Sequence, residues 1–266
     1  MPAFNWIQSV KNRIFSPSVN RRRSSRSQIC EQAVTLEQRV MLSANAIFDQ
    51  VHHRLTVTGS DSIEIDSNAA GQVRVNNTLV NNGQGSLDAN DVQEIVVKGS
   101  NRADTIDLRQ VQPGTFQSIT SVEVHGNGGD DLIYGSGYGD VIYGNDGDDV
   151  ISGGAGNDRI YGNEGNDRIG GGIGDDIIHG SSGDDLVSGG SGNDRVTGEN
   201  GQDDVRGGGG NDSLDGGAGD DVLNGDDGND IEHGGEGNDI VSGGEGNDRL
   251  FGDDVDPSTG SDSLAG

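Results

Sequence analysis

An aspartate recurs at every ninth residue through the second half of the chain. The members of this series are Asp131, Asp140, Asp149, Asp158, Asp167, Asp176, Asp185, Asp194, Asp203, Asp212, Asp221, Asp230, Asp239 and Asp248. Carboxylate oxygens are ligands for hard metal cations. Held close together, they repel one another unless cations neutralise them. The series therefore points to cation binding, provided that a repeated structure brings the carboxylates together.

The nine-residue unit that carries the aspartate supplies such a structure. Residues 126–251 contain 14 units, with Gly at position 1 in all of them and at position 4 in 13, Asp at position 6 throughout, and Ile, Val or Leu at position 8 in 13. Glycine permits the positive φ angles and close backbone approach that tight turns require. We expect a six-residue turn followed by a three-residue strand whose middle side chain points inward.

Two units make one 18-residue coil, and stacked coils make two parallel sheets that face each other across an aliphatic seam. One predicted seam contains Ile133, Ile151, Ile169, Val187, Val205, Leu223 and Val241, and the facing seam contains Ile142, Ile160, Ile178, Val196, Leu214 and Leu250. Ordering one backbone residue costs roughly 1–2 kcal/mol, whereas burying one aliphatic side chain returns about 1.5–3 kcal/mol. One such side chain per nine residues cannot stabilise the fold alone.

The aspartates are the expected source of the missing stability. Alternate units stack on the same edge, so the carboxylates form two columns, and the Gly-rich turns add backbone carbonyls that need partners. An all-oxygen site of this kind suits Ca²⁺, which takes six to eight oxygens, better than Mg²⁺, which demands a tighter octahedron. The absence of thiols and of His at the ligand positions argues against zinc or copper.

The unit is similar to GGxGxDxUx, the calcium-binding nonapeptide of the repeat-in-toxin, or haemolysin-type, family. The resemblance covers residues 126–251, nearly half of the chain. It implies an all-β fold, a right-handed parallel β-roll or β-helix solenoid, in an exported bacterial protein with Ca²⁺ between successive turns on each edge. The implied ligands are the position-6 Asp side chains and turn carbonyls, with at most 12 interior sites in a monomeric chain.

Three residues depart from the repeat. Tyr138 stands where Gly is expected, which puts the sites of Asp140 in doubt. Glu199 occupies position 2, where positive φ is awkward for a residue with a Cβ. Glu232 occupies the inward position 8, and a lone buried carboxylate there is costly. We expect a local distortion or a frayed coil at Glu232.

Composition limits the alternatives. The net charge is −28, and residues 126–251 contain 29 Asp or Glu against five Arg, which argues against a general nucleic-acid binder. Cys30 is the only cysteine, so an intrachain disulfide is impossible, and no apolar run is long enough to span a membrane. A disordered Gly/Asp linker would not keep its phase over 126 residues. A metal-free solenoid would not need Asp in every unit.

Residues 1–45 are basic, and the stretch "LEQRVMLSA" at 36–44 resembles the LEPRxLLSA string of a bacterial export leader, with Gln38 in place of Pro and Met41 in place of Leu. The resemblance predicts a largely disordered export leader over 1–45. The alternatives are a disordered basic tail and a tail that binds nucleic acid or another polyanion through residues 11–26.

Two further regions flank the array. Residues 46–125 alternate apolar and polar residues in short runs and include "GSNRADTID" (99–107), a degenerate repeat in phase with the array. We expect degenerate β coils there that cap the N-terminal end of the solenoid. Residues 252–266 are an irregular fifteenth repeat with a five-residue insertion around Pro257.

Catalytic motifs are missing from the sequence. Neither H-E-x-x-H nor G-x-S-x-G occurs, and we expect no enzyme activity. The favoured function is an exported calcium-binding β-roll, secreted or at the cell surface, that folds when calcium binds outside the cell and has a structural or surface role. Its cell-surface or matrix partner cannot be named from the sequence. The alternative is the calcium-binding portion of a larger secreted toxin, adhesin or hydrolase.

Overall fold

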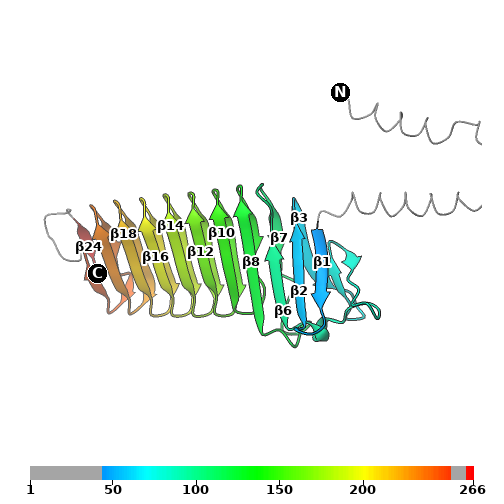
Figure 1. Ribbon diagram of the computed structural model, residues 1–266. Helices are drawn as coiled ribbons and strands as arrows, with labels where there is room; N and C mark the ends of the chain where they lie inside the picture. Colours follow the sequence, from blue (N-terminus) through cyan, green and yellow to red (C-terminus); the bar gives the residue numbers. More distant parts are fainter. Residues whose placement is uncertain (1–43, 253–261) are drawn as a thin grey trace, which may run out of the picture. The chain divides into compact units, whose positions relative to one another are not determined.

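The computed structural model describes residues 44–252 and 262–266, which stack as successive β coils in an elongated rod (Figure 1). The predicted leader lies outside these residues except for Ala44 and Asn45, which begin the first strand. Within the described part of the chain the helical structure is one 3₁₀ turn, η1 (Ala89–Asp91). No helix there is long and apolar enough to cross a bilayer. The prediction of an all-β parallel solenoid is confirmed.

Alternate strands of the chain belong to two sheets, which we name sheet A and sheet B. Sheet A runs in the order β1 (Ala44–Asp49), β2 (Arg54–Gly59), β6 (Glu94–Lys98), β8 (Ser121–Gly128), β10 (Asp140–Asp146), β12 (Arg159–Glu164), β14 (Ile177–Ser182), β16 (Arg195–Asn200), β18 (Ser213–Ala218), β20 (Ile231–Glu236) and β23 (Arg249–Phe251). The strands from β2 to β23 are parallel, and from β8 to β20 each pairs with the strand two units away.

Sheet B faces sheet A across the interior. It runs in the order β24 (Ser263–Ala265), β21 (Ile240–Ser242), β19 (Val222–Gly228), β17 (Asp204–Gly209), β15 (Leu186–Ser191), β13 (Arg168–Ile173), β11 (Val150–Ala155), β9 (Leu132–Tyr134), β7 (Thr105–Asp107), β3 (Ser62–Ser67), β4 (Val73–Val75) and β5 (Thr78–Leu79), and β22 (Glu245–Gly246) also pairs with β19. The pairing of β7 with β9 places residues 99–107 in the stack as a genuine coil.

The two aliphatic seams form as predicted. Every predicted seam residue is buried except Leu250, which packs half-exposed against the core near the end of sheet A. Identical positions pair between coils, for example Ile142 with Ile160 and Ile151 with Ile169. The period of 18 residues per coil therefore places one aliphatic side chain per strand into the interior.

The predicted division into a six-residue turn and a three-residue strand is wrong. Strand β12 continues for six residues through Gly162 to Glu164, and only three residues separate it from β13. The reason is that residues after the first Gly of each unit also pair between coils, as Gly154 does with Gly172. Each turn is therefore a sharp corner that ends in the position-6 aspartate.

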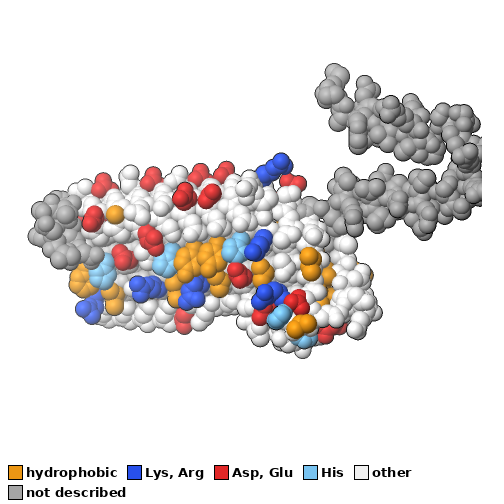
Figure 2. Space-filling model, viewed as in Figure 1, with side chains coloured by type: hydrophobic (Ala, Val, Ile, Leu, Met, Phe, Trp, Pro, Cys, Tyr) orange, Lys and Arg blue, Asp and Glu red, His pale blue; other side chains and the backbone are white. Residues whose placement is uncertain are grey.

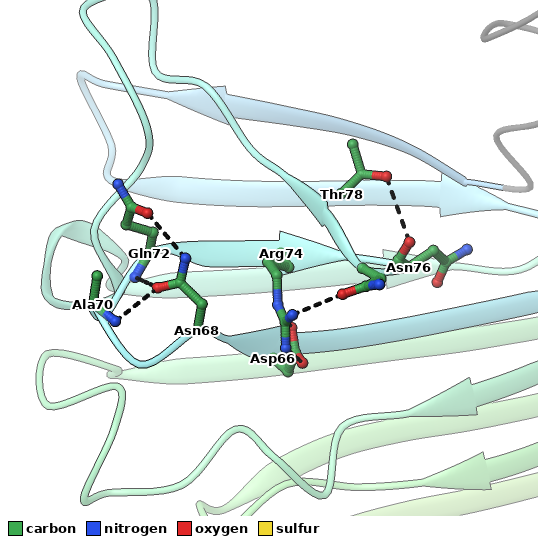
Figure 3. Close-up of polar contacts among 8 residues, drawn as sticks. Asp66, Asn68, Ala70, Gln72, Arg74, Asn76 and Thr78 are labelled. Atoms are coloured by element: carbon green, nitrogen blue, oxygen red, sulfur yellow. Dashed lines mark hydrogen bonds and ion pairs between the residues drawn. The ribbon is translucent and has the colours of Figure 1, made fainter.

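At the N-terminal end of the rod the parallel pattern stops. β1 pairs antiparallel with β2, and β4 pairs antiparallel with both β3 and β5. Polar side chains fix this end of sheet B (Figure 3): Arg74 forms an ion pair with Asp66, and Asn68 Oδ1 accepts hydrogen bonds from the backbone amides of Ala70 and Gln72. The core is richer here than in the array and includes Phe116 and Leu87.

The outer face of sheet A has a row of stacked rings. His125, Tyr143, Tyr161 and His179 lie at position 9 of successive coils, with ring centroids 4.9–5.1 Å apart and nearly parallel planes. Figure 2 shows an apolar stripe with His side chains at its ends on one face of the rod. Parallel in-register pairing explains the row, because equivalent side chains lie one strand spacing apart.

Candidate metal centre

The position-6 aspartates are buried at the corners of the coils. The exposed fraction is at most 3% for Asp131, Asp140, Asp149, Asp158, Asp167, Asp176, Asp185, Asp194, Asp203, Asp212, Asp221, Asp230 and Asp239. Asp248, near the end of the array, is half-buried. Each aspartate directly precedes or begins a strand and points inward, as the seam residue two positions later does.

Hydrogen bonds link these aspartates into two columns. Within a column, the backbone amide of each aspartate donates to Oδ1 of the aspartate in the next coil, at 2.7–3.1 Å. Asp131 belongs to one column and Asp140 to the other. The predicted alternation between two edges is what the structure shows, and the ladder accounts for only one oxygen of each carboxylate.

The second oxygen has no donor through most of both columns. Among the described residues, Oδ2 is buried without a hydrogen-bond partner in Asp131, Asp149, Asp158, Asp167, Asp176, Asp185, Asp194, Asp203, Asp212, Asp221 and Asp230. A buried carboxylate oxygen without a donor is strongly unfavourable. Such an oxygen is available to a cation.

The glycine at position 1 leaves room for this oxygen. A Cβ built on Gly162 would overlap Oδ2 of Asp167 and would lie 2.7 Å from the carbonyl oxygen of Gly180 in the next coil. The same arrangement recurs at Gly144, where Asp149 and Gly162 supply the two oxygens. Position 1 is therefore Gly because a carboxylate oxygen and a carbonyl oxygen both face the space that a side chain would fill.

Burial raises the pKa of these carboxyl groups above the ordinary value. The pKa is raised to about 6 for Asp131, Asp167, Asp176 and Asp212, to about 7 for Asp140, Asp149, Asp185 and Asp221, and to about 8 for Asp158. Desolvation is the largest cause. The backbone amides of the ladder oppose it, except at Asp140, where the hydroxyl and the amide of Ser136 do so, and for most of these groups neighbouring aspartates also raise the pKa. The columns therefore hold their charge at a cost that a bound cation would offset.

The donor set fits calcium. It consists of carboxylate and carbonyl oxygens, which are the ligands that Ca²⁺ takes in proteins. In residues 44–252 and 262–266, no three His, Cys, Asp or Glu side chains gather as a metal-binding group. At the columns, carboxylates lie beside backbone carbonyls, so a site here combines both kinds of oxygen.

Comparison with known protein families also indicates calcium binding by the array. The RTX calcium-binding nonapeptide repeat matches in overlapping four-copy segments across residues 125–256. The array belongs to the RTX repeat family. No curated protein matches the chain. The RTX array thus coincides with the part of the rod in which the two aspartate columns run.

Two RTX-type aspartates were missing from the predicted set. Asp104 of the degenerate repeat is buried, and its amide donates to Asp131 at 2.7 Å. Asp262 accepts from the amide of Asp239 at 3.1 Å, 23 residues away instead of 18, as a five-residue insertion requires. The available signal was the phase of Asp104 with the repeat and, for Asp262, its phase once the five-residue insertion is allowed for. The predicted limit of 12 sites omitted this extension of one column.

Asp140 differs from the other members of its column. The amide of Ser136 donates to its Oδ2 and the Ser136 hydroxyl donates to its Oδ1, both at 2.6 Å. The site predicted to be doubtful because of Tyr138 is therefore altered chiefly by Ser136. Tyr138 donates its hydroxyl hydrogen to the Phe116 carbonyl and packs against the core.

The other two departures have different outcomes. Glu199 adopts φ of 80° at position 2, and its carboxylate lies 2.9 Å from Nδ1 of His179. The prediction of a local distortion or a frayed coil at Glu232 is wrong, because Glu232 pairs in register with Leu214 of β18 on one side and Leu250 of β23 on the other. Glu232 is nevertheless fully buried.

A second ladder runs along the surface of the corners. Oxygens of Asn or Asp at position 5 accept hydrogen bonds from the backbone of the following coil, as Asn193 does from Asn211 at 3.0 Å. These side chains are exposed. Position 5 therefore stabilises the stacking of the turns from outside, whereas position 6 faces the interior.

The histidines lie away from the columns. His125 lies 2.6 Å from Glu123 through Nε2 and stacks on Tyr143. His233 stacks on Phe251 with ring centroids 4.6 Å apart. Both belong to the outer face of sheet A, where parallel stacking places them.

Proposed function

We propose that this chain is an exported calcium-binding β-roll whose folding depends on calcium bound along the two aspartate columns. The observation that carries the proposal is the buried Oδ2 row, in which one carboxylate oxygen at most corners faces inward without a donor. When bound, calcium would neutralise the buried carboxylates. Oδ2 of the position-6 aspartates and the adjacent glycine carbonyls are the groups that would hold it.

The rest of the chain supports a role outside the cell. At low cytosolic calcium the charge of the array favours an expanded chain, and the millimolar calcium outside cells matches the affinity of about 10⁻⁴–10⁻³ M of extracellular calcium modules. The leader-like string at 36–44 and the absence of any intrachain disulfide are consistent with a metal-stabilised exported protein. The rod, whose inward groups are used for packing and binding, supports our proposal of a structural or surface role without catalysis.

Far-UV circular dichroism of the full chain at pH 7.5 tests this function. We expect a transition to β structure as CaCl₂ is raised through the sub-millimolar to millimolar range, and no such transition with MgCl₂. A spectrum that is already β-rich without calcium and does not change on its addition would show that the roll needs no metal. An equal response to both ions would show that the sites are not calcium sites.

A further inference from the structure

Glu232 is the one position-8 residue of the array that is not aliphatic. It lies in sheet A between Leu214 and Leu250, with no exposed surface. Neither of its carboxylate oxygens has a hydrogen-bond partner. A charged group in an aliphatic seam is costly unless it is compensated, so its surroundings decide what it does.

Those surroundings are oxygens. Side chains two residues apart on a strand point to the same face, so Glu232 points inward alongside Asp230. A Cβ built on Gly225 would overlap three oxygens: Oδ2 of Asp230, Oε1 of Glu232 and the carbonyl oxygen of Gly243. At the regular corners, such as Gly144, only one carboxylate oxygen and one carbonyl oxygen occupy this space.

Electrostatics make this arrangement unfavourable without a cation. The pKa of Glu232 is raised to about 7, first by burial and then by the charges of Asp230 and Asp248, while the nearby amide of Gly225 opposes the shift. Both Asp230 Oδ2 and Glu232 lack a hydrogen-bond donor. Two carboxylates that share a buried space are stabilised either by a shared proton or by a metal ion.

We propose that Glu232 is an additional calcium ligand, and that the site it forms with Asp230 and the Gly243 carbonyl binds calcium more tightly than the regular corners. The proposal rests on calcium binding by the columns and adds to it. Affinity in oxygen-ligand sites rises with the number of charged ligands, and this corner has one more carboxylate than its neighbours. The seam loses one aliphatic side chain and gains a ligand inside the roll.

The test is a calcium titration of the full chain at pH 7.5 in competition with a chromophoric chelator. Wild type is compared with Glu232→Gln, which removes the charge and nearly keeps the shape, and with Glu232→Leu, which supplies the aliphatic side chain of the other coils. The matched control is Glu236→Gln, which removes the same charge from an exposed position of the same strand. Circular dichroism at saturating calcium verifies that each variant is folded.

We expect wild type and Glu236→Gln to bind one ion more tightly than the rest. In Glu232→Gln and Glu232→Leu the affinity for this tightest ion, which fills first in the titration, should fall by roughly 10- to 100-fold. This is the range found when groups that support a metal site are removed. Both Glu232 variants should also show more β structure than wild type by circular dichroism without calcium, because a buried charge is gone.

Two results would overturn the proposal. One is a tight first step that survives in both Glu232 variants, and the other is a wild type that binds all its calcium with a single affinity. Either would show that Glu232 adds nothing to the calcium affinity of this corner. A wild type that binds no calcium would instead contradict the proposed function as a whole.

Discussion

The backbone amide of Asp149 donates to Oδ1 of Asp167 in the next coil at 2.8 Å, while Oδ2 of Asp167 is buried without a donor. The first oxygen holds two coils together, and the second is left for a cation. This division of one carboxylate between structure and binding repeats along both columns. Because one carboxylate has both roles, changes in the charge, the shape and the protonation of the site should have separate effects.

Removing one column charge should have opposite effects with and without calcium. Asp167→Asn keeps an oxygen for the ladder but removes the charge whose burial raises the pKa to about 6. At pH 8 we expect more β structure than in wild type without calcium and a less stable calcium-saturated fold. The measurements are the far-UV circular dichroism spectrum in EGTA and the urea midpoint in about 10 mM CaCl₂, on the order of extracellular calcium or above.

Asp148→Asn is the control for that variant. Asp148 is exposed at position 5, and its Oδ1 accepts from the amide of Asn166 at 2.8 Å, a role that an Asn oxygen can take over. Its β content in EGTA and its urea midpoint in calcium should stay near those of wild type. If Asp167→Asn behaved like Asp148→Asn, the column carboxylates would have no special role.

A methyl group at position 1 should disrupt one corner. Gly162→Ala places a Cβ onto Oδ2 of Asp167 and 2.7 Å from the Gly180 carbonyl. We expect a loss of about 1–3 kcal/mol in the calcium-saturated free energy of unfolding, which is typical of overpacking, together with weaker calcium binding. Chemical denaturation and a calcium titration measure the two effects.

Gly170→Ala is the matched substitution at position 9 of the same unit. A Cβ at Gly170 would have no atom within 4 Å, and this residue is not at positive φ. We expect no loss of stability or calcium affinity. Equal losses in the two variants would mean that glycine at position 1 is not required by the carboxylate.

Acid should stabilise the calcium-free roll. The pKa is raised to about 7 for Asp149 and to about 8 for Asp158, whereas an Asp in an unfolded chain titrates near 4. The fold thus binds protons more tightly than the unfolded chain, so this contribution to stability is fully present below pH of about 4 and is lost as pH rises through about 6–8.

The β structure seen by circular dichroism in EGTA should therefore be greater at pH 5 than at pH 8. With calcium the urea midpoint should instead be higher at pH 8, because protons compete with calcium for the same oxygens. A calcium-free β content that stayed constant or increased toward pH 8 would contradict the assigned burial of the columns.

Glu199 is a site of local strain that a glycine should relieve. Its φ of 80° lies in the left-handed region, which costs a residue with a Cβ about 1–2 kcal/mol. Part of the gain from Glu199→Gly is offset by the greater freedom of glycine in the unfolded chain. We expect a net stabilisation of about 0.5–1 kcal/mol in the calcium-saturated protein by thermal or urea unfolding.

The control is Glu236→Gly, at a position that is not in the left-handed region. Glycine there should destabilise the strand by up to about 1 kcal/mol. A stabilisation in both variants would point to the loss of negative charge, and not to backbone strain, as the cause.

The sequence predicted the columns and the seams because both follow from a strict period of two units per coil. Asp at position 6 and an aliphatic residue at position 8 point inward together, as Asp149 and Ile151 do. The length of the strands was not predictable in the same way, because Gly favours turns, whereas the pairing that extends β12 through Gly162 comes from the neighbouring coils. The environment of Glu232 likewise depends on a carbonyl of the next coil.

A crystal structure of the full chain grown with calcium, with ions located from their anomalous scattering, tests the central claim most directly. We expect ions on both edges of the array within 2.3–2.6 Å of column carboxylate oxygens and glycine carbonyls. Ions confined to exposed position-5 side chains such as Asp148, with Oδ2 of the column aspartates uncoordinated, would contradict it.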